Sequence, residues 1–175
     1  LSESEIVAIA AKTDMELEYF VHGALCMCVS GQCLMTSVLG GRSGNRGLCA
    51  QPCRLPFGVN SKGGNALSLK DLSLVDELRR LEKAGICSFK IEGRMKRPEY
   101  TAIVTKIYSK ALKEHRQPSD EEMETLEKAF SRQGFTQGYF NGDKKDMFGR
   151  REEPDKDTEK LFTLARKGYS EGELR

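Results

Sequence analysis

The sequence predicts an α/β fold built on about three parallel strands. Two short segments, residues 15–21 and 86–91, have the alternation or the apolar run expected of strands. Two longer segments, residues 73–84 and 99–115, have apolar residues at helical spacing. Strands that alternate with helices along a chain form a parallel sheet, because each helix returns the chain across it.

The first elements are a helix and a strand. Residues 2–12 have apolar side chains at helical spacing, and residues 15–21 alternate apolar with polar side chains before an apolar run. A short strand is also predicted at residues 66–69. The chain is therefore expected to enter the sheet twice before its second helix.

The later elements are bounded by helix signals. Gly85 follows the helical segment 73–84 as a C-terminal stop, and the strand 86–91 comes next. Pro98 fits the first turn of the helix at 99–115, whose inward face is apolar. Polar residues that follow the strands are expected to meet at one edge of the sheet, where α/β proteins bind ligands.

Three strands are too few to close an eight-stranded barrel. Residues 1–116, including the Cys-rich loop 24–64, are therefore predicted to be the C-terminal portion of a TIM-barrel-like domain. Residues 117–149 are predicted to extend that domain with a capped helix and an aromatic turn segment. Residues 150–175 are predicted to be a polar linker and a helix that lead to a domain outside this chain.

Composition argues against two classes of protein. No apolar run reaches the roughly 18 residues of a membrane span. No charged start followed by an apolar stretch marks a secretory signal, so a cytoplasmic location is predicted. In a chain without secretion, the six cysteines indicate metal binding or catalysis rather than disulfides.

Four of the cysteines lie in the loop 24–64, with the spacing Cys26-x6-Cys33-x15-Cys49-x3-Cys53. Thiolates are soft ligands that bind zinc, copper(I) and iron–sulfur clusters. Structural zinc sites usually have two closely spaced pairs, whereas only Cys49 and Cys53 are closely spaced here, which favours a cluster. A zinc knuckle and a set of unligated thiols are the alternatives.

Three side chains after strand ends are the predicted catalytic residues. His22 precedes the first cysteine and acts either as a proton donor and acceptor or as a hydrogen-bonding residue that orients the loop. Glu92 and Arg94 follow the strand 86–91. They either fix a polar substrate, with Arg94 binding a carboxylate or phosphate, or form a structural ion pair.

Basic residues near the cysteines are the predicted substrate-binding residues. The middle of the loop contains Arg42, Arg46 and Arg54 and no acidic residue, so it either attracts an anionic substrate or forms a solvated surface. Lys90 is the fourth predicted substrate-binding residue. It is also a candidate partner for the carboxylate of Glu18.

Four blocks of this sequence resemble the collagenase-like peptidase family (peptidase family U-thirty-two). The first reads Glu-Tyr-Phe-Val-His-Gly-Ala-Leu-Cys at 18–26 and continues as Ser-Gly-Gln-Cys-Leu at 30–34. The second reads Gly-Gly-Arg-Ser-Gly-Asn-Arg-Gly at 40–47 and continues as Cys-Ala-Gln-Pro-Cys-Arg at 49–54. The third and fourth are Lys-Ile-Glu-Gly-Arg-Met-Lys at 90–96 and Gly-Phe-Thr-Gln-Gly-Tyr-Phe at 134–140.

The resemblance implies a TIM-barrel-like catalytic domain of which this chain supplies the last strands. It also implies a 4Fe–4S cluster whose ligands fall on Cys26, Cys33, Cys49 and Cys53, while zinc stays the alternative. Some members of the family are named collagenases or proteases. Others are oxygen-independent hydroxylases that act on a pyrimidine in rRNA or tRNA with prephenate as co-substrate, or on ubiquinone precursors. The block at 40–47 is most similar to the rRNA-modifying members.

An RNA substrate would give the basic and aromatic residues a role. The three arginines of the loop would contact phosphates, and the target base would lie in a loop or be extruded. Phe135, Tyr139 and Phe140 either stack on bases or form local core. The predicted partners are rRNA or tRNA, and the N-terminal half and C-terminal domain of the same protein, without a membrane.

These observations lead to three hypotheses about function. The first is an iron–sulfur-dependent hydroxylase that modifies an RNA pyrimidine. The second is a peptidase in which Cys26 and His22 form a nucleophile and its base, although neither a Gly-x-Ser-x-Gly nor a His-Glu-x-x-His motif occurs. The third is a zinc-stabilised RNA-binding module without catalysis.

Overall fold

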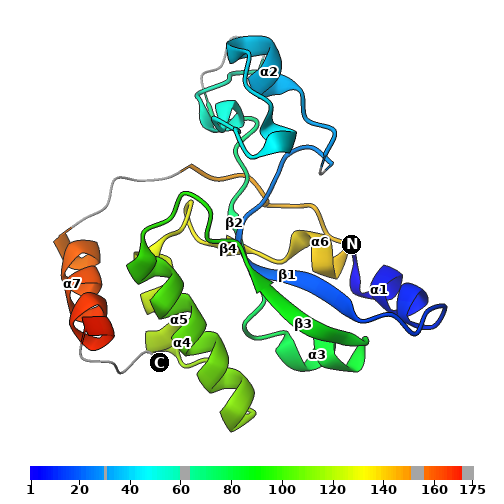
Figure 1. Cartoon of the computed structure of the whole chain (residues 1–175), viewed down its shortest axis with the longest axis vertical. Coiled ribbons are helices and arrows are strands. Elements are labelled where there is room, and N and C mark those ends of the chain that lie inside the picture. The colour runs from blue at the N-terminus through cyan, green and yellow to red at the C-terminus, as the bar shows by residue number, and fades with distance from the viewer. Residues whose placement is uncertain (30, 60–63, 151–155, 171–175) are drawn as a thin grey trace.

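A computed structural model describes the chain except for residues 30, 60–63, 151–155 and 171–175 (Figure 1). Its elements in chain order are α1 (Glu3–Ala10), β1 (Leu17–Ala24), α2 (Met35–Gly40), η1 (Gly44–Arg46), η2 (Pro52–Arg54), β2 (Asp71–Ser73), α3 (Leu78–Lys83), β3 (Ile86–Ile91), α4 (Pro98–Glu114), α5 (Asp120–Ala129), β4 (Phe135–Thr136), α6 (Gly138–Asn141) and α7 (Lys156–Ser170). The predicted mixture of helices and strands is confirmed.

The described strands form one mixed sheet in the order β3-β1-β2-β4. The pairs β1–β3 and β2–β4 are parallel, but β2 runs antiparallel to β1. The prediction of a purely parallel sheet is therefore wrong for β2. The chain leaves β1 at Ala24 and returns beside it at Asp71, so it enters β2 without crossing the sheet.

Two predicted features of the sheet have different outcomes. The strand predicted at residues 66–69 is replaced by β2 at Asp71–Ser73, while Leu69 makes an isolated bridge with Phe148. The described strands form an open sheet, and the TIM-barrel-like arrangement stays a prediction.

Helix α4 supplies much of the core. It begins at Pro98, and the apolar face predicted from its 3.6-residue period is buried. The buried residues of that face are Tyr100, Ile103, Val104, Ile107, Tyr108 and Ala111. They join Val21 of β1 and Leu72 of β2 in one hydrophobic cluster, so the helix anchors the end of β1 from which the cysteine loop leaves.

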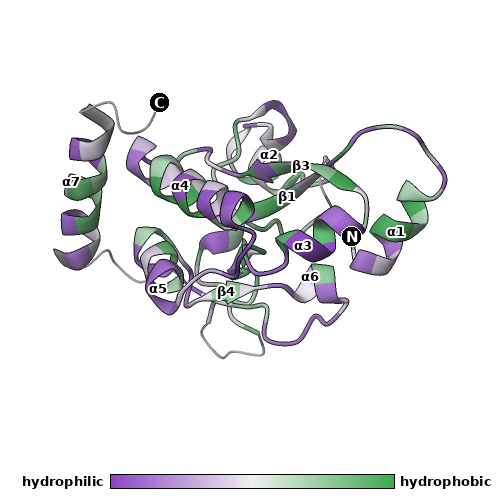
Figure 2. Ribbon diagram, turned by 90° about the horizontal axis from the view of Figure 1, so that it is seen from below, coloured by the Kyte–Doolittle hydropathy of each residue, from purple (hydrophilic) through white to green (hydrophobic). Residues whose placement is uncertain are grey.

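Helices α4, α5 and α7 lie together on one side of the sheet (Figure 1). The predicted capping box of α5 is confirmed, because Ser119 and the side chain of Glu122 bond each other's backbone N–H groups. Figure 2 shows hydrophobic and hydrophilic residues alternating along α7, and the buried Phe162 belongs to the shared core. The linker predicted just before α7 lies largely outside the described residues.

Residues 25–59, apart from residue 30, form a lobe that stands away from the sheet (Figure 1). We call it the cysteine lobe; it contains α2, η1 and η2. Many of its apolar side chains are exposed, among them Val29, Leu34, Val38, Leu39, Leu48, Leu55 and Val59. None of the helices in the described part of the chain has the length and apolar character needed to cross a membrane.

Candidate metal centre

The four predicted ligand cysteines all lie in the cysteine lobe, just beyond the carboxyl end of β1. Cys26 follows β1, Cys33 precedes α2, Cys49 lies between η1 and η2, and Cys53 lies within η2. Each is a free thiol; Cys26 is exposed and the other three are partly buried. One short lobe therefore presents all four predicted ligand thiols in the free form.

Mutual electrostatic effects show that these four thiols share one neighbourhood. Burial raises the pKa of Cys26, and the thiols of Cys53, Cys49 and Cys33 raise it further. Burial also raises the pKa of Cys53, Arg54 opposes that shift, and Cys49 and Cys33 add to it. A bound cation would reverse this balance, because it would stabilise the thiolates that now disfavour one another.

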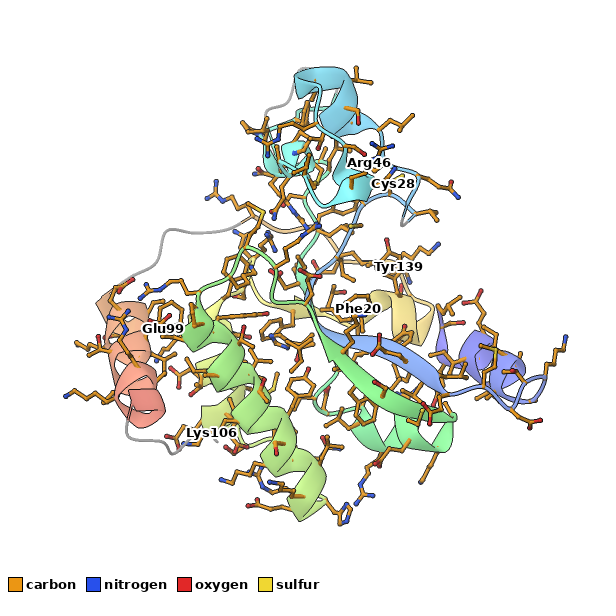
Figure 3. All side chains as sticks on the ribbon, in the orientation of Figure 1. Phe20, Cys28, Arg46, Glu99, Lys106 and Tyr139 are labelled. Carbon is orange, nitrogen blue, oxygen red and sulfur yellow. The ribbon has the colours of Figure 1, made fainter. Side chains whose placement is uncertain are left out.

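The two remaining cysteines are placed differently. Cys87 is exposed on β3 and its thiol lies 3.5 Å from the carbonyl oxygen of Leu17, at the opposite end of β1 from Cys26. The apolar run around Cys87 predicts a buried side chain, but β3 exposes it. Cys28 is exposed in the lobe (Figure 3).

The thiols do not form a closed site for one ion. Over the residues that the structure describes, no three His, Cys, Asp or Glu side chains are close enough to hold a metal ion together. Zinc requires four thiolates at about 2.3 Å from one centre. Iron–sulfur clusters are held by four cysteine thiolates, so the chemistry of the donor set suits such a cluster.

Local backbone geometry positions Cys49 and Cys53. Gly47 ends η1 with a φ of 82°, in the left-handed region that glycine adopts without strain. Gln51 adopts the same region with a φ of 56° and precedes Pro52, which opens η2. The backbone N–H of Gln51 lies 3.3 Å from Cys49 Sγ, and Thr36 Oγ1 lies 3.7 Å from it. Amide donors of this kind stabilise thiolate ligands.

Arg54 fastens the cysteine lobe to the sheet. Its guanidinium donates to the carbonyl of Leu69 at 2.7 Å, to that of Leu25 at 2.5 Å and to Ser68 Oγ at 3.3 Å. These bonds join the start of the lobe, at Leu25, and the segment that leads into β2 to one side chain. The substrate-binding role of Arg54 stays a prediction, since both terminal nitrogens already bind protein acceptors.

Arg42 and Arg46 are exposed on the same lobe, and Figure 3 shows the position of Arg46. Arg42 Nε donates to the carbonyl oxygen of Leu48 at 3.3 Å, which shapes the turn but leaves the residue exposed. Both arginines are therefore accessible to an anionic substrate, as their predicted role requires.

His22 lies in the core rather than at an open surface. It is 1% exposed, and its Nδ1 lies 3.2 Å from Tyr108 Oη. Burial lowers the pKa of His22 to about 3, and Lys96 contributes to the shift, so the ring is neutral at physiological pH. Among the described residues, its Nε2 has no hydrogen-bond partner. This position fits the orienting alternative, and the catalytic role stays a prediction.

Glu92 and Arg94 lie beside the start of the lobe. Glu92 accepts a bond from the backbone N–H of Arg94 at 2.9 Å, and Arg94 is exposed. Glu92 packs closely on Gly23, and a Cβ added at Gly23 would lie 2.7 Å from the Cβ of Glu92. Lys90 Nζ lies 2.7 Å from Glu18 Oε1 on the exposed face of β1 and β3. This is the ion pair predicted as the alternative to substrate binding by Lys90. The roles of these residues toward substrate stay predictions.

The aromatic block at 134–140 contributes to the core. Phe140 is buried, and Phe135 packs against His22 with their ring centres 5.2 Å apart. Tyr139 is half-buried and contributes to α6 (Figure 3). This favours the core alternative over base stacking for Phe135 and Phe140.

A buried ion pair beneath the lobe escapes prediction from the sequence. Asp71 is 1% exposed and Arg132 is 4% exposed, and Arg132 Nη1 donates to Asp71 Oδ1. Arg132 Nη2 also donates to Gln51 Oε1 at 3.5 Å, which connects the pair to the cysteine turn. Arg132 lies in a short polar segment and Asp71 lies among alternating leucines, and neither segment indicates which residue is its partner.

Comparison with known proteins identifies a family and several relatives. The sequence profile described as Peptidase family U32 matches residues 1–148. The 23S rRNA 5-hydroxycytidine synthase of Escherichia coli (strain K12) is 42% identical over 119 residues, which cover 64% of this chain and 18% of that protein. None of the solved structures gave a significant match.

Two further relatives differ in their names. A tRNA hydroxylation protein of Bacillus subtilis (strain 168) is 37% identical over 124 residues, covering 63% of this chain and 29% of that protein. A collagenase of Porphyromonas gingivalis is 38% identical over 141 residues, covering 73% of this chain and 39% of that protein. This chain thus spans well under half the length of these relatives.

Proposed function

Because this chain belongs to peptidase family U32, we propose that it is part of a hydroxylase that modifies a pyrimidine base in RNA. The observation that carries the proposal is the gathering of four thiols in one lobe. A cysteine peptidase needs one thiol and a nearby base, not four thiols. The names of two relatives, an rRNA hydroxycytidine synthase and a tRNA hydroxylation protein, support the same substrate class.

In the proposed enzyme, Cys26, Cys33, Cys49 and Cys53 hold an iron–sulfur cluster. All donors are thiols, three are partly buried, and the Gln51 amide lies beside one sulfur, which are features that suit such a cluster. A bound cluster supplies electron transfer and Lewis acidity at the carboxyl end of β1.

RNA would bind across the exposed side of the lobe. Arg42 and Arg46 are exposed beside the cysteines, and arginine contacts to phosphates position a nucleic acid without reading its sequence. The target base would be unstacked to reach the centre, as in other enzymes that modify a base. Prephenate remains the proposed co-substrate from the family resemblance.

The collagenase name of one relative supports peptide hydrolysis as the alternative function. The geometry favours it less. The ring nitrogen of His22 that has a partner bonds Tyr108, and no His–Cys hydrogen bond occurs among the described residues. A peptidase would require His22 to leave the core and approach Cys26.

Metal analysis tests the proposed centre. Protein purified without oxygen should be brown and contain iron and sulfide, and Cys49→Ser should lose both. The matched control is Cys87→Ser, which should keep the iron because this thiol lies at the other end of β1. A colourless wild-type protein with one zinc ion would favour the binding-module alternative and contradict the proposal.

RNA mass spectrometry tests the proposed reaction. In cells that lack the gene for this chain, one pyrimidine in rRNA or tRNA should lose the mass of one oxygen atom. The wild-type gene and the Cys87→Ser variant should restore the modification, whereas Cys49→Ser should not. Unchanged nucleosides in both RNA classes would refute the hydroxylase.

A further inference from the structure

We propose that Arg132, held in place by the buried carboxylate of Asp71, is a positioning residue for the cysteine centre. It acts through Gln51, whose turn sets Cys49 relative to Cys53. The inference rests on the proposed function for its redox consequence, but the positioning itself concerns thiols that are present in the metal-free protein.

A continuous chain of contacts links the sheet to the sulfur of Cys49. Asp71, the first residue of β2, accepts a bond from Arg132 Nη1. Arg132 Nη2 donates to the side-chain carbonyl of Gln51 at 3.5 Å. The backbone N–H of Gln51 lies 3.3 Å from Cys49 Sγ. The buried pair therefore fixes a side chain whose own backbone contacts a predicted ligand.

Gln51 needs such an anchor because its backbone is unfavourable. The left-handed region is strained for a residue with a Cβ, and Gln51 has a φ of 56°. Its side chain contacts Arg132 on one side and Met95 Sδ at 3.8 Å on the other. The amide of Gln51 thus joins the cysteine lobe to the loop after β3 and to the segment before β4.

The rigidity of the anchor comes from burial. Asp71 and Arg132 are almost fully buried, so their attraction is weakly screened by solvent. The ring of Phe130 lies 4.9 Å from the Arg132 guanidinium carbon and confines it further. Because Nη1 of Arg132 binds Asp71 and the guanidinium packs on Phe130, the side chain has little freedom to move away from Gln51.

The anchor also places positive charge behind the centre. Arg132 contacts Gln51, whose backbone N–H lies beside Cys49 Sγ, and Arg54 directly follows Cys53, so two guanidinium groups lie near the thiols. A bound cluster gains negative charge when it is reduced, and nearby positive charge favours that state. Removing Arg132 should therefore lower the reduction potential of the centre.

Alkylation of the metal-free protein tests the positioning. In reduced wild-type protein, iodoacetamide should modify Cys49 more slowly than the exposed Cys28, as mass spectrometry of each site would report. Gln51→Ala should speed modification of Cys49 several-fold. Gln51→Gly should have a smaller effect, because glycine keeps the left-handed turn without the side-chain anchor.

Variants of the anchor complete the test. Arg132→Gln should also speed modification of Cys49 several-fold and leave Cys87 unchanged. The double variant Asp71→Asn with Arg132→Gln avoids an unpaired buried carboxylate and should show the same effect if the single variant does not fold. Arg79→Gln, on the surface of α3, is the matched control. A folded anchor variant with wild-type alkylation of Cys49 would overturn the inference.

The reduction potential of the reconstituted centre provides a second readout. Arg132→Gln should shift the potential to more negative values, whereas the double variant, which leaves the net charge unchanged, should shift it less. Protected Cys49 in a wild-type protein that binds no iron would end the proposed cluster but keep the positioning role. An iron-loaded protein in which Arg132→Gln alters neither readout would end the positioning role alone.

Discussion

Replacement of Gly23 by alanine should strongly destabilise the junction between the sheet and the cysteine lobe. Gly23 has a φ of 121°, which L-residues rarely adopt, and an added Cβ would lie 2.7 Å from both the Cβ and the carbonyl oxygen of Glu92. Backbone strain of this kind costs about 1–3 kcal/mol. Overpacking against a fixed neighbour costs about 1–3 kcal/mol more. We therefore expect the free energy of unfolding to fall by about 2–6 kcal/mol.

Two other glycines separate the two contributions. Gly142 has a φ of 71°, and a Cβ added there would have no neighbouring atom within 4 Å, so Gly142→Ala should show strain alone, about 1–2 kcal/mol. Gly40 has neither a positive φ nor a close neighbour, so Gly40→Ala should stay within about 0.5 kcal/mol of wild type. Urea unfolding followed by circular dichroism measures all three. An equal loss in Gly23→Ala and Gly142→Ala would refute the steric reasoning.

Three other perturbations test the core. Burial lowers the pKa of His22 to about 3, so between about pH 6.5 and pH 3 the unfolded chain binds a proton at this histidine that the folded chain does not bind. The free energy of unfolding should therefore fall as the pH falls from about 6.5 toward 3. His22→Asn should flatten this dependence in urea titrations. Tyr108→Phe removes the bond to the carbonyl of Val21 at 2.9 Å and should lower the free energy of unfolding by about 1–3 kcal/mol, whereas unchanged thermal unfolding would contradict this. Phe162→Ala should lower the stability of the packing of α7 by about 3–5 kcal/mol. Amide exchange should become faster in α7 while the amides of β1 stay protected.

Local signals in the sequence predict local structure well. The apolar period of residues 99–115 predicts the buried face of α4, and the Ser119–Glu122 pattern predicts the cap of α5. Each signal depends on residues three or four positions apart, which the helix itself brings together. The resemblance to a family, carried by four short blocks, is confirmed by the profile match to residues 1–148.

Features that depend on distant contacts are not predictable in this way. The direction of β2 depends on where a long loop returns to the sheet, and no local pattern encodes that point. The Asp71–Arg132 pair joins residues 61 positions apart, and each residue alone resembles an ordinary surface charge. His22 shows the converse problem, because its position after a polar and aromatic strand resembles that of a catalytic base although the ring is buried.

Because Ala24 and Asp71 are paired neighbours, the segment that carries the cysteine lobe leaves and rejoins the sheet at one place. The register of β1 and β2 is set by residues on either side of this junction, so the length of the intervening segment has little influence on that register. Doubling a flexible loop of this kind costs only about 0.6 kcal/mol in closure entropy. Insertions or replacements in the cysteine lobe can therefore change the chemistry of the protein while the sheet keeps its structure.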